Sequence, residues 1–394
     1  MLAPGHRSDR IGFVHMLRGV AALIVVYFHW GEMFWRSNEV AAQISFSTPL
    51  QPGTWLPHLN LTNWLYDVQF SFGSFGVALF FVVSGFVIPI SLEKLGSKAF
   101  LVRRLFRLYP TYLVGLAVTY LVLYWSAQIN DKSFPFTLAD YLKNASMFRD
   151  VFDAPTIDNI NWTLENEVKF YLLCAFLARI SSLSRGRTIV LTVTALSGLA
   201  FVIGPLAARL SSSGIADLYP LATPIRAAAP FVCFMFFGTA FYNLYCRRWT
   251  MTVFLGVSFV LAGAFAFNVG TIFAVHSPVS FYVSYGAALA CFGFFYRVRD
   301  RLPEPRCLSF AANISYPLYI LHGVSGYALI SFLYPLQPYP YLVLLEVFVL
   351  VVAASYALHR FVEVPSNRLG YALVKPVDTS PLQPRPSGVP PNPA

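Results

Sequence analysis

An arginine and a histidine stand inside the first apolar stretch of the chain, in the run RGVAALIVVYFH. Arg18 and His29 are eleven residues apart. On an α-helix this spacing corresponds to about 16 Å of rise and brings both side chains to nearly the same face. Charged and titratable groups are costly inside a membrane span, so they mark a functional site by default. A neutral histidine there could be a general base; the alternative is a histidine that a neighbouring helix satisfies.

A second cluster is basic and lies in the run RRLFRLYP. Arg104 and Arg107 are spaced i, i+3, and Arg103 and Arg107 are spaced i, i+4, so each pair shares a helix face. Such a fork of guanidinium groups suits a phosphate or pyrophosphate. The alternative is a basic anchor for lipid headgroups at the membrane surface.

A third cluster, NWTLENEVKFY, begins an apolar stretch with Glu165, Glu167 and Lys169. Acidic residues in the first turn of a helix interact favourably with the helix dipole. Glu167 also enters the membrane zone, where a buried carboxylate needs a partner. The sequence is consistent with either a structural ion pair or a catalytic or substrate-binding carboxylate. We interpret Ser84, in VVSGF, as a packing residue because no GxSxG motif surrounds it.

Two late motifs complete the set of candidate residues. His322 ends the run ISYPLYILH and lies about a third of the way into a predicted span. Glu363, in HRFVEVP, is expected to pair with Arg360 or another basic residue at the end of the last span.

The composition identifies the elements that must position these residues. Of 394 residues, 57% are hydrophobic and 12% are charged, and the mean hydropathy is +0.59. Soluble domains carry about 25% charged residues, so we predict an all-α, polytopic membrane protein. The apolar runs predict about ten transmembrane helices, near residues 11–30, 70–91, 105–126, 160–179, 188–208, 227–246, 250–268, 279–296, 311–334 and 340–361.

The distribution of charge predicts the topology. When these spans alternate across the membrane, most of the 28 lysines and arginines fall on one side, so we expect both termini to be cytoplasmic. The net charge of +10 then reflects topology, and we expect no nucleic-acid partner. The five cysteines lack metal-ligand spacing, so we expect neither a metal site nor a disulfide framework. We expect a cytoplasmic segment at 1–10, a transmembrane domain at 11–365, and a disordered Pro-rich tail at 366–394.

The pieces LRGVAALIVVYFH, FGVALFFVVSGF, RRLFRLYP, WTLENEVKFY, ISYPLYILH and FVEVP, in this order, resemble the acyltransferase-3 family of membrane O-acyltransferases. The family's Arg-x10-His motif corresponds to Arg18 and His29, and its Arg-x-x-Arg motif to Arg104 and Arg107. Its fourth-span glutamate corresponds to Glu167, and its late tyrosine and histidine to Tyr316 and His322. This chain departs from many members at His15 and Ala78, where they carry aspartate.

The resemblance implies an enzyme of the inner (plasma) membrane that moves an acyl group, usually acetyl, from cytoplasmic acyl-CoA to a carbohydrate hydroxyl. The acceptor would be a surface glycan, a lipid-linked sugar or another glycolipid, with membrane lipids around the protein. The expected catalytic residues are His29, Arg18 and Glu167. Arg103, Arg104 and Arg107 would hold the phosphates of CoA, and Tyr316 and His322 would bind substrate.

Two other functions are compatible with the residues alone. A transporter or flippase of a glycan or small anionic solute would also have polar residues in its spans and a basic inner face. Such proteins often show inverted repeats and paired broken helices, of which the sequence gives no convincing pair. A membrane scaffold or sensor would tolerate substitution of Arg18 or His29.

Overall fold

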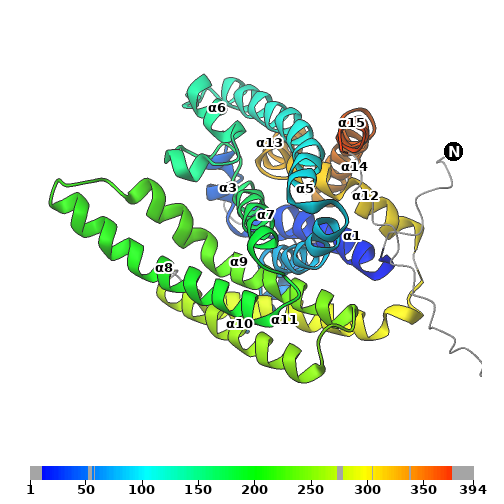
Figure 1. Ribbon diagram of the computed structural model, residues 1–394. Helices are drawn as coiled ribbons and strands as arrows, with labels where there is room; N and C mark the ends of the chain where they lie inside the picture. Colours follow the sequence, from blue (N-terminus) through cyan, green and yellow to red (C-terminus); the bar gives the residue numbers. More distant parts are fainter. Residues whose placement is uncertain are drawn as a thin grey trace, which may run out of the picture.

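The computed structural model describes residues 11–51, 56, 58–272, 278–303, 305–336 and 339–374, and within them the chain is helical and contains no β-strand (Figure 1). Residues 1–10 and 375–394, which hold the predicted N-terminal segment and most of the predicted tail, lie outside this range. The α-helices are α1 (Gly12–Tyr27), α2 (Phe34–Arg36), α3 (Asn38–Ile44), α4 (His58–Asp67), α5 (Phe72–Ile129), α6 (Leu138–Ala145), α7 (Trp162–Ile180), α8 (Gly186–Ser212), α9 (Tyr219–Tyr245), α10 (Met251–Ile272), α11 (Pro278–Val298), α12 (Arg306–Leu321), α13 (Val324–Leu333), α14 (Pro340–Leu358) and α15 (Val364–Ala372).

Five short helices of other types connect them. Two are π-helical, Phe28–Met33 and His359–Glu363, and three are 3-10 helices, Arg149–Phe152, Arg299–Arg301 and Tyr334–Leu336. Helix α15 extends the helical part of the chain beyond the predicted boundary at residue 365.

The prediction of an all-helical membrane protein is confirmed. Within the described ranges, 7 helices are long and apolar enough to cross a membrane, and the bent pair α12–α13 raises the number to 8. Each predicted span overlaps helical residues: α5 holds two spans, the charged α7 covers another, and the span near 311–334 covers both α12 and α13. The orientation of the termini stays a prediction.

The long helix α5 is two segments joined at Gly96. This glycine has φ 72° and ψ 165°, a conformation outside the helical region that costs glycine little because it has no Cβ atom. The first segment starts at Ser71, whose hydroxyl accepts from the Ser74 N–H. The break at Gly96 separates the two segments, and Arg103, Arg104 and Arg107 lie near the start of the second one.

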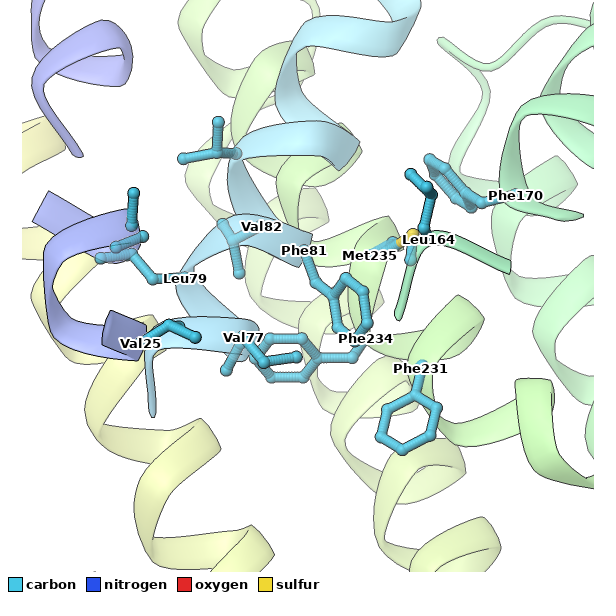
Figure 2. Packing of buried hydrophobic residues seen from close by; sticks show 14 of the residues in the cluster. Val25, Val77, Leu79, Phe81, Val82, Leu164, Phe170, Phe231, Phe234 and Met235 are labelled. Atoms are coloured by element: carbon cyan, nitrogen blue, oxygen red, sulfur yellow. The ribbon is translucent and has the colours of Figure 1, made fainter. Parts of the chain in front are cut away.

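Helix α1 lies between α5 and α12, and α9 packs against α5, α8 and α10. In Figure 1, α8, α10 and α11 gather on one side of the molecule, away from α14 and α15. Figure 2 shows how Val25 of α1, Val77 and Phe81 of α5, and Phe231 and Phe234 of α9 fill the space between these helices.

Glycines set how closely the helices approach. A Cβ atom at Gly19, next to Arg18, would lie 2.6 Å from the carbonyl oxygen of Leu308 in α12. A Cβ atom at Gly85 of α5 would lie 1.8 Å from the carbonyl oxygen of Met235 in α9. Small residues allow this backbone contact, which brings α12 against the polar stretch of α1.

Two predicted regular helices are interrupted. The span predicted near 311–334 bends by 79° between α12 and α13, so His322 ends a helix instead of lying within one. The first span is α-helical only to Tyr27, and His29 lies in the π-helical turn that follows. Hydrophobic periodicity did not reveal either feature, because both sides of each break are apolar.

The contact between α5 and α9 can be tested at Gly238. A Cβ atom there would lie 2.1 Å from the carbonyl oxygen of Val82, so Gly238→Ala must push the helices apart. We expect a loss of about 1–3 kcal/mol in the free energy of unfolding, measured as a lower melting temperature in detergent. The control is Gly263→Ala in α10, where the added methyl group meets open space. Equal melting temperatures for the two variants would contradict the packing.

Candidate active site

Arg18, Arg104 and Arg107 form a cluster of cations inside the helical bundle. Arg18 comes from α1 and the other two from the second segment of α5, and all three side chains keep partial access to solvent. Arg107 lies close enough to act electrostatically on both Arg18 and Arg104. Within the described part of the chain, no carboxylate forms an ion pair with any of them. Guanidinium groups that are enclosed and unpaired favour an anionic ligand.

The carboxylate of Glu167 lies beside this cluster. Its Oε1 accepts from Ser84 Oγ at 2.5 Å and from the hydroxyl of Tyr171. Glu167 acts electrostatically on Arg18 and Arg104, and the guanidinium of Arg104 lies 5.0 Å from the ring centroid of Tyr171. Ser84, which the sequence placed among packing residues, therefore holds a charged group of the candidate site.

The neighbouring charges of α7 point elsewhere. Glu165 pairs with Arg149, at 3.1 Å between Oε1 and Nε, and Lys169 pairs with Asp150. The structural role that the sequence allowed for this motif is thus carried by two separate ion pairs, one of Glu165 and one of Lys169. Glu167 faces away from them because positions two residues apart lie about 200° apart around a helix.

Glu363 is buried and bonds to His359 Nδ1 at 2.7 Å across the second π-helical turn. The prediction allowed Arg360 or another basic residue as the partner of Glu363; Arg360 is exposed, and the π-helical turn aligns His359 with the carboxylate instead. Glu363 also acts electrostatically on Arg18. Tyr316 of α12 is buried nearby and donates its hydroxyl proton to the carbonyl of Leu108 at 2.9 Å, which ties α12 to α5.

The second cluster surrounds His29 and His322. Their ring centroids are 5.0 Å apart in an edge-to-face arrangement. His29 Nδ1 lies 2.5 Å from the hydroxyl of Tyr327, a residue that the sequence did not single out. No motif could have identified Tyr327, because the break between α12 and α13 is what turns its side chain back toward α1.

The tautomer of His322 follows from its neighbours. Nδ1 lies 2.7 Å from the carbonyl oxygen of Tyr319 and 3.2 Å from that of Leu318. Carbonyl oxygens only accept, so Nδ1 carries the proton and Nε2 keeps a lone pair. Nε2 is buried and has no hydrogen-bond partner among the described residues. A buried polar atom without a partner is rare in native structures, so it points to a ligand or an ordered water.

Trp30 and Asp158 hold the helix break that carries His322. The indole Nε1 of Trp30 donates to the carbonyl of His322 at 2.7 Å, and a Cβ atom on Gly326 would lie 2.3 Å from that nitrogen. The carboxylate of Asp158, which is 1% exposed, accepts from the Ile160 N–H at 3.4 Å and from the N–H of Val324, the first residue of α13. A carboxyl group at this position accepts hydrogen bonds from the N–H groups that have no partner within the helix at its start.

The structure therefore divides the predicted residues into two groups. Arg18, Arg104, Arg107, Glu167 and Tyr316 gather at one level of the bundle. His29 and His322 gather just beyond the end of α1, about three helical turns from Arg18, and Arg103 lies at the edge of the first group against α15.

Among the residues that the structure describes, no group of three or more histidine, cysteine, aspartate or glutamate side chains is placed to hold a metal ion. The five cysteines are free.

Comparison with known proteins identifies the family. A family model for an acyltransferase domain, acyltransferase-3, matches residues 11–360. The chain belongs to this acyltransferase family. It is also 26% identical, over 296 residues, to nodulation protein 10 of Rhizobium leguminosarum bv. viciae, which covers 68% of this chain and 76% of that protein. No solved structure matches the chain.

Asp158 makes the stability of this acyltransferase depend on pH. Burial raises the pKa of its carboxyl from 3.8 to about 7, against two backbone hydrogen bonds that lower it. The folded protein therefore retains a proton that the unfolded chain loses, and stability falls as pH rises from about 4 to about 7. Asp158→Asn keeps an oxygen acceptor and cannot ionise, so its melting temperature should fall less between about pH 5 and about pH 8. The control is the exposed Asp153→Asn in the same loop, and parallel curves for all three proteins would contradict this account.

Proposed function

We propose that this protein transfers an acyl group, acetyl by default, from cytoplasmic acyl-CoA to a hydroxyl of an extracytoplasmic or lipid-linked carbohydrate. The observation that carries the proposal is the presence of two different polar clusters along the first helical stretch, one at Arg18 and one at His29. Arg18 of α1 lies beside arginines that form no ion pair with a described carboxylate and that suit the phosphates of a donor, and His29, in the π-helical turn after α1, lies beside a second histidine with a free lone pair. The membership in an acyltransferase family supports the same reading.

The donor would enter at the arginines. Arg103, Arg104 and Arg107 hold the phosphates of CoA, since guanidinium groups bind phosphate oxygens in a fixed fork. By the positive-inside rule, this end of the bundle would lie at the cytoplasmic face of the inner (plasma) membrane, with both termini on that side. From there the pantetheine arm extends past Arg18 toward His29, over about 16 Å of helix rise.

Arg18 and Glu167 position the donor and do not contact the carbonyl group that is transferred. Three turns of helix separate Arg18 from His29, too far for one guanidinium to reach the reacting atoms and the phosphates together. Arg18 orients the arm of the donor, and Glu167, held by Ser84 and Tyr171, keeps Arg18 and Arg104 in place when no donor is bound. Such fixed geometry is what raises the rate of a reaction between two bound substrates.

His29 acts as the general base. The hydroxyl of Tyr327 lies 2.5 Å from His29 Nδ1 and 3.3 Å from Met33 Sδ. We assign to His29 the tautomer that this role requires, in which Nδ1–H donates to the Tyr327 oxygen and the lone pair lies on Nε2. Nε2 takes the proton of the acceptor hydroxyl as that oxygen attacks the thioester carbonyl. The C–S bond then breaks, an ester forms, and the CoA thiolate takes the proton back from His29.

His322 and Tyr316 bind the substrates. The free Nε2 of His322 accepts from a second hydroxyl, and a sugar ring offers neighbouring hydroxyls to two histidines whose rings are 5.0 Å apart. The hydroxyl of Tyr316 is bonded to the Leu108 carbonyl, so Tyr316 would contact the donor through its ring.

Replacement of His29 tests the chemical step. We expect His29→Ala to lower acyl transfer at least about 100-fold, because a general base contributes about 10²–10⁴-fold. The measurement is mass spectrometry of ester-linked acyl groups on glycans from the native host, at matched membrane levels of protein. His15→Ala, on the same helix, should keep activity. Undiminished esters in His29→Ala, in a host where deletion of the gene removes them, would contradict the role of His29.

Replacement of the paired arginines tests the donor. Arg104→Ala with Arg107→Ala should weaken binding of labelled acetyl-CoA to the purified protein by at least about tenfold, since each charged contact is worth about 1.5–3 kcal/mol. The matched control is Arg185→Ala with Arg187→Ala, which removes two exposed arginines outside the cluster. If the control variant loses as much affinity, or if wild-type protein binds no acetyl-CoA, the donor assignment fails and a transporter of anionic solutes becomes the better explanation.

A further inference from the structure

An arginine and a tyrosine stack at the edge of the cation cluster. The guanidinium carbon of Arg103 lies 3.4 Å from the ring centroid of Tyr371, which belongs to α15. Tyr371 is 54% exposed, so the pair presents an open flat surface. Residue 371 lies beyond the stretch 11–360 that the family model matches, and no motif singled it out.

Helix α15 is firmly docked beside this pair. A Cβ atom on Gly370 would lie 2.7 Å from the Cβ atom of Phe106, so the backbone of α15 rests directly on α5. The preceding π-helical turn joins α15 to α14 without a loop. The position of Tyr371 is therefore set by the packing of α15, and its stacking on Arg103 is not needed to hold the helix.

The stacked pair is continuous with the donor site. Arg107 acts electrostatically on Arg103 as well as on Arg104 and Arg18. Cations thus follow one another from the exposed pair at α15, through the fork of Arg104 and Arg107, to Arg18 on α1. A donor that lies along this path with its thioester toward His29 would have its nucleotide end on the side of Arg103 and Tyr371.

We propose that the Arg103–Tyr371 pair binds the adenine ring of the acyl donor, and that this enzyme therefore selects nucleotide-containing thioesters over shorter ones. This inference rests on the proposed function and names the part of CoA that the fork of arginines leaves unbound. A purine ring stacks on tyrosine rings and on guanidinium planes, and such contacts tolerate the edge of a surface. The charge of Arg103 also suits the phosphates next to the base.

Two donors of different length test the proposal on the full-length protein in detergent. Acetyl-CoA carries the nucleotide, and S-acetyl-pantetheine lacks it and cannot reach Tyr371. We expect Tyr371→Ala to weaken acetyl-CoA binding about tenfold, the scale of one base-stacking contact, and to leave transfer from S-acetyl-pantetheine unchanged. Tyr371→Phe keeps the ring and should behave as wild type. Leu373→Ala, an exposed position of the chain just after α15, is the matched control.

The outcomes separate this inference from the proposed function. If Tyr371→Ala binds acetyl-CoA as wild type does, while the double variant at Arg104 and Arg107 does not, the adenine assignment is wrong and the donor assignment stands. If Tyr371→Ala weakens both donors equally, its effect is a displacement of α15, which also overturns the assignment. If wild-type protein binds neither donor, both proposals fail.

Discussion

Enclosing arginine side chains in an apolar helical bundle is the constraint on which the rest of this structure depends. A charge in the membrane zone is costly unless a partner or an aqueous cavity compensates it. Here Glu167 and Glu363 interact with Arg18 electrostatically without touching it. None of the described carboxylates forms a direct ion pair with the cluster of Arg18, Arg104 and Arg107. Helices α5, α7, α12 and α15 converge around these charges, and the close glycine contacts of α1 with α12 and of α5 with α9 make that convergence possible.

The second requirement is to hold a histidine in position beyond the end of α1, the helix that carries Arg18. Both elements that do so depart from regular α-helix. The π-helical turn Phe28–Met33 carries His29, and the break between α12 and α13 carries His322. Such departures leave backbone groups without partners within the helix, and side chains provide the missing hydrogen bonds. Trp30 donates to the His322 carbonyl, and Asp158 accepts from the N–H of Val324 at the start of α13. Irregular backbone of this kind often marks functional sites in helices.

Sequence patterns were sufficient for the helical class, for the positions of the apolar helices and for most charged members of the site, because charge inside an apolar run is visible without coordinates. They could not assign partners. The sequence around Ser84 indicates a packing residue, whereas in the structure its hydroxyl donates to Glu167. Glu363 bonds to His359 because a π-helical turn changes the helical register. Tyr327 was missed altogether, since only the 79° bend brings it to His29. Interruptions flanked by apolar residues on both sides leave no trace in hydropathy.

A structure of the protein in a lipid nanodisc with a non-hydrolysable analogue of acetyl-CoA would test the central claim most directly. The account predicts that the diphosphate lies against Arg104 and Arg107, that the pantetheine arm passes Arg18, and that the acyl carbonyl carbon lies within contact distance of His29. A donor bound with its acyl group away from His29, or with its phosphates outside the arginine cluster, would contradict it.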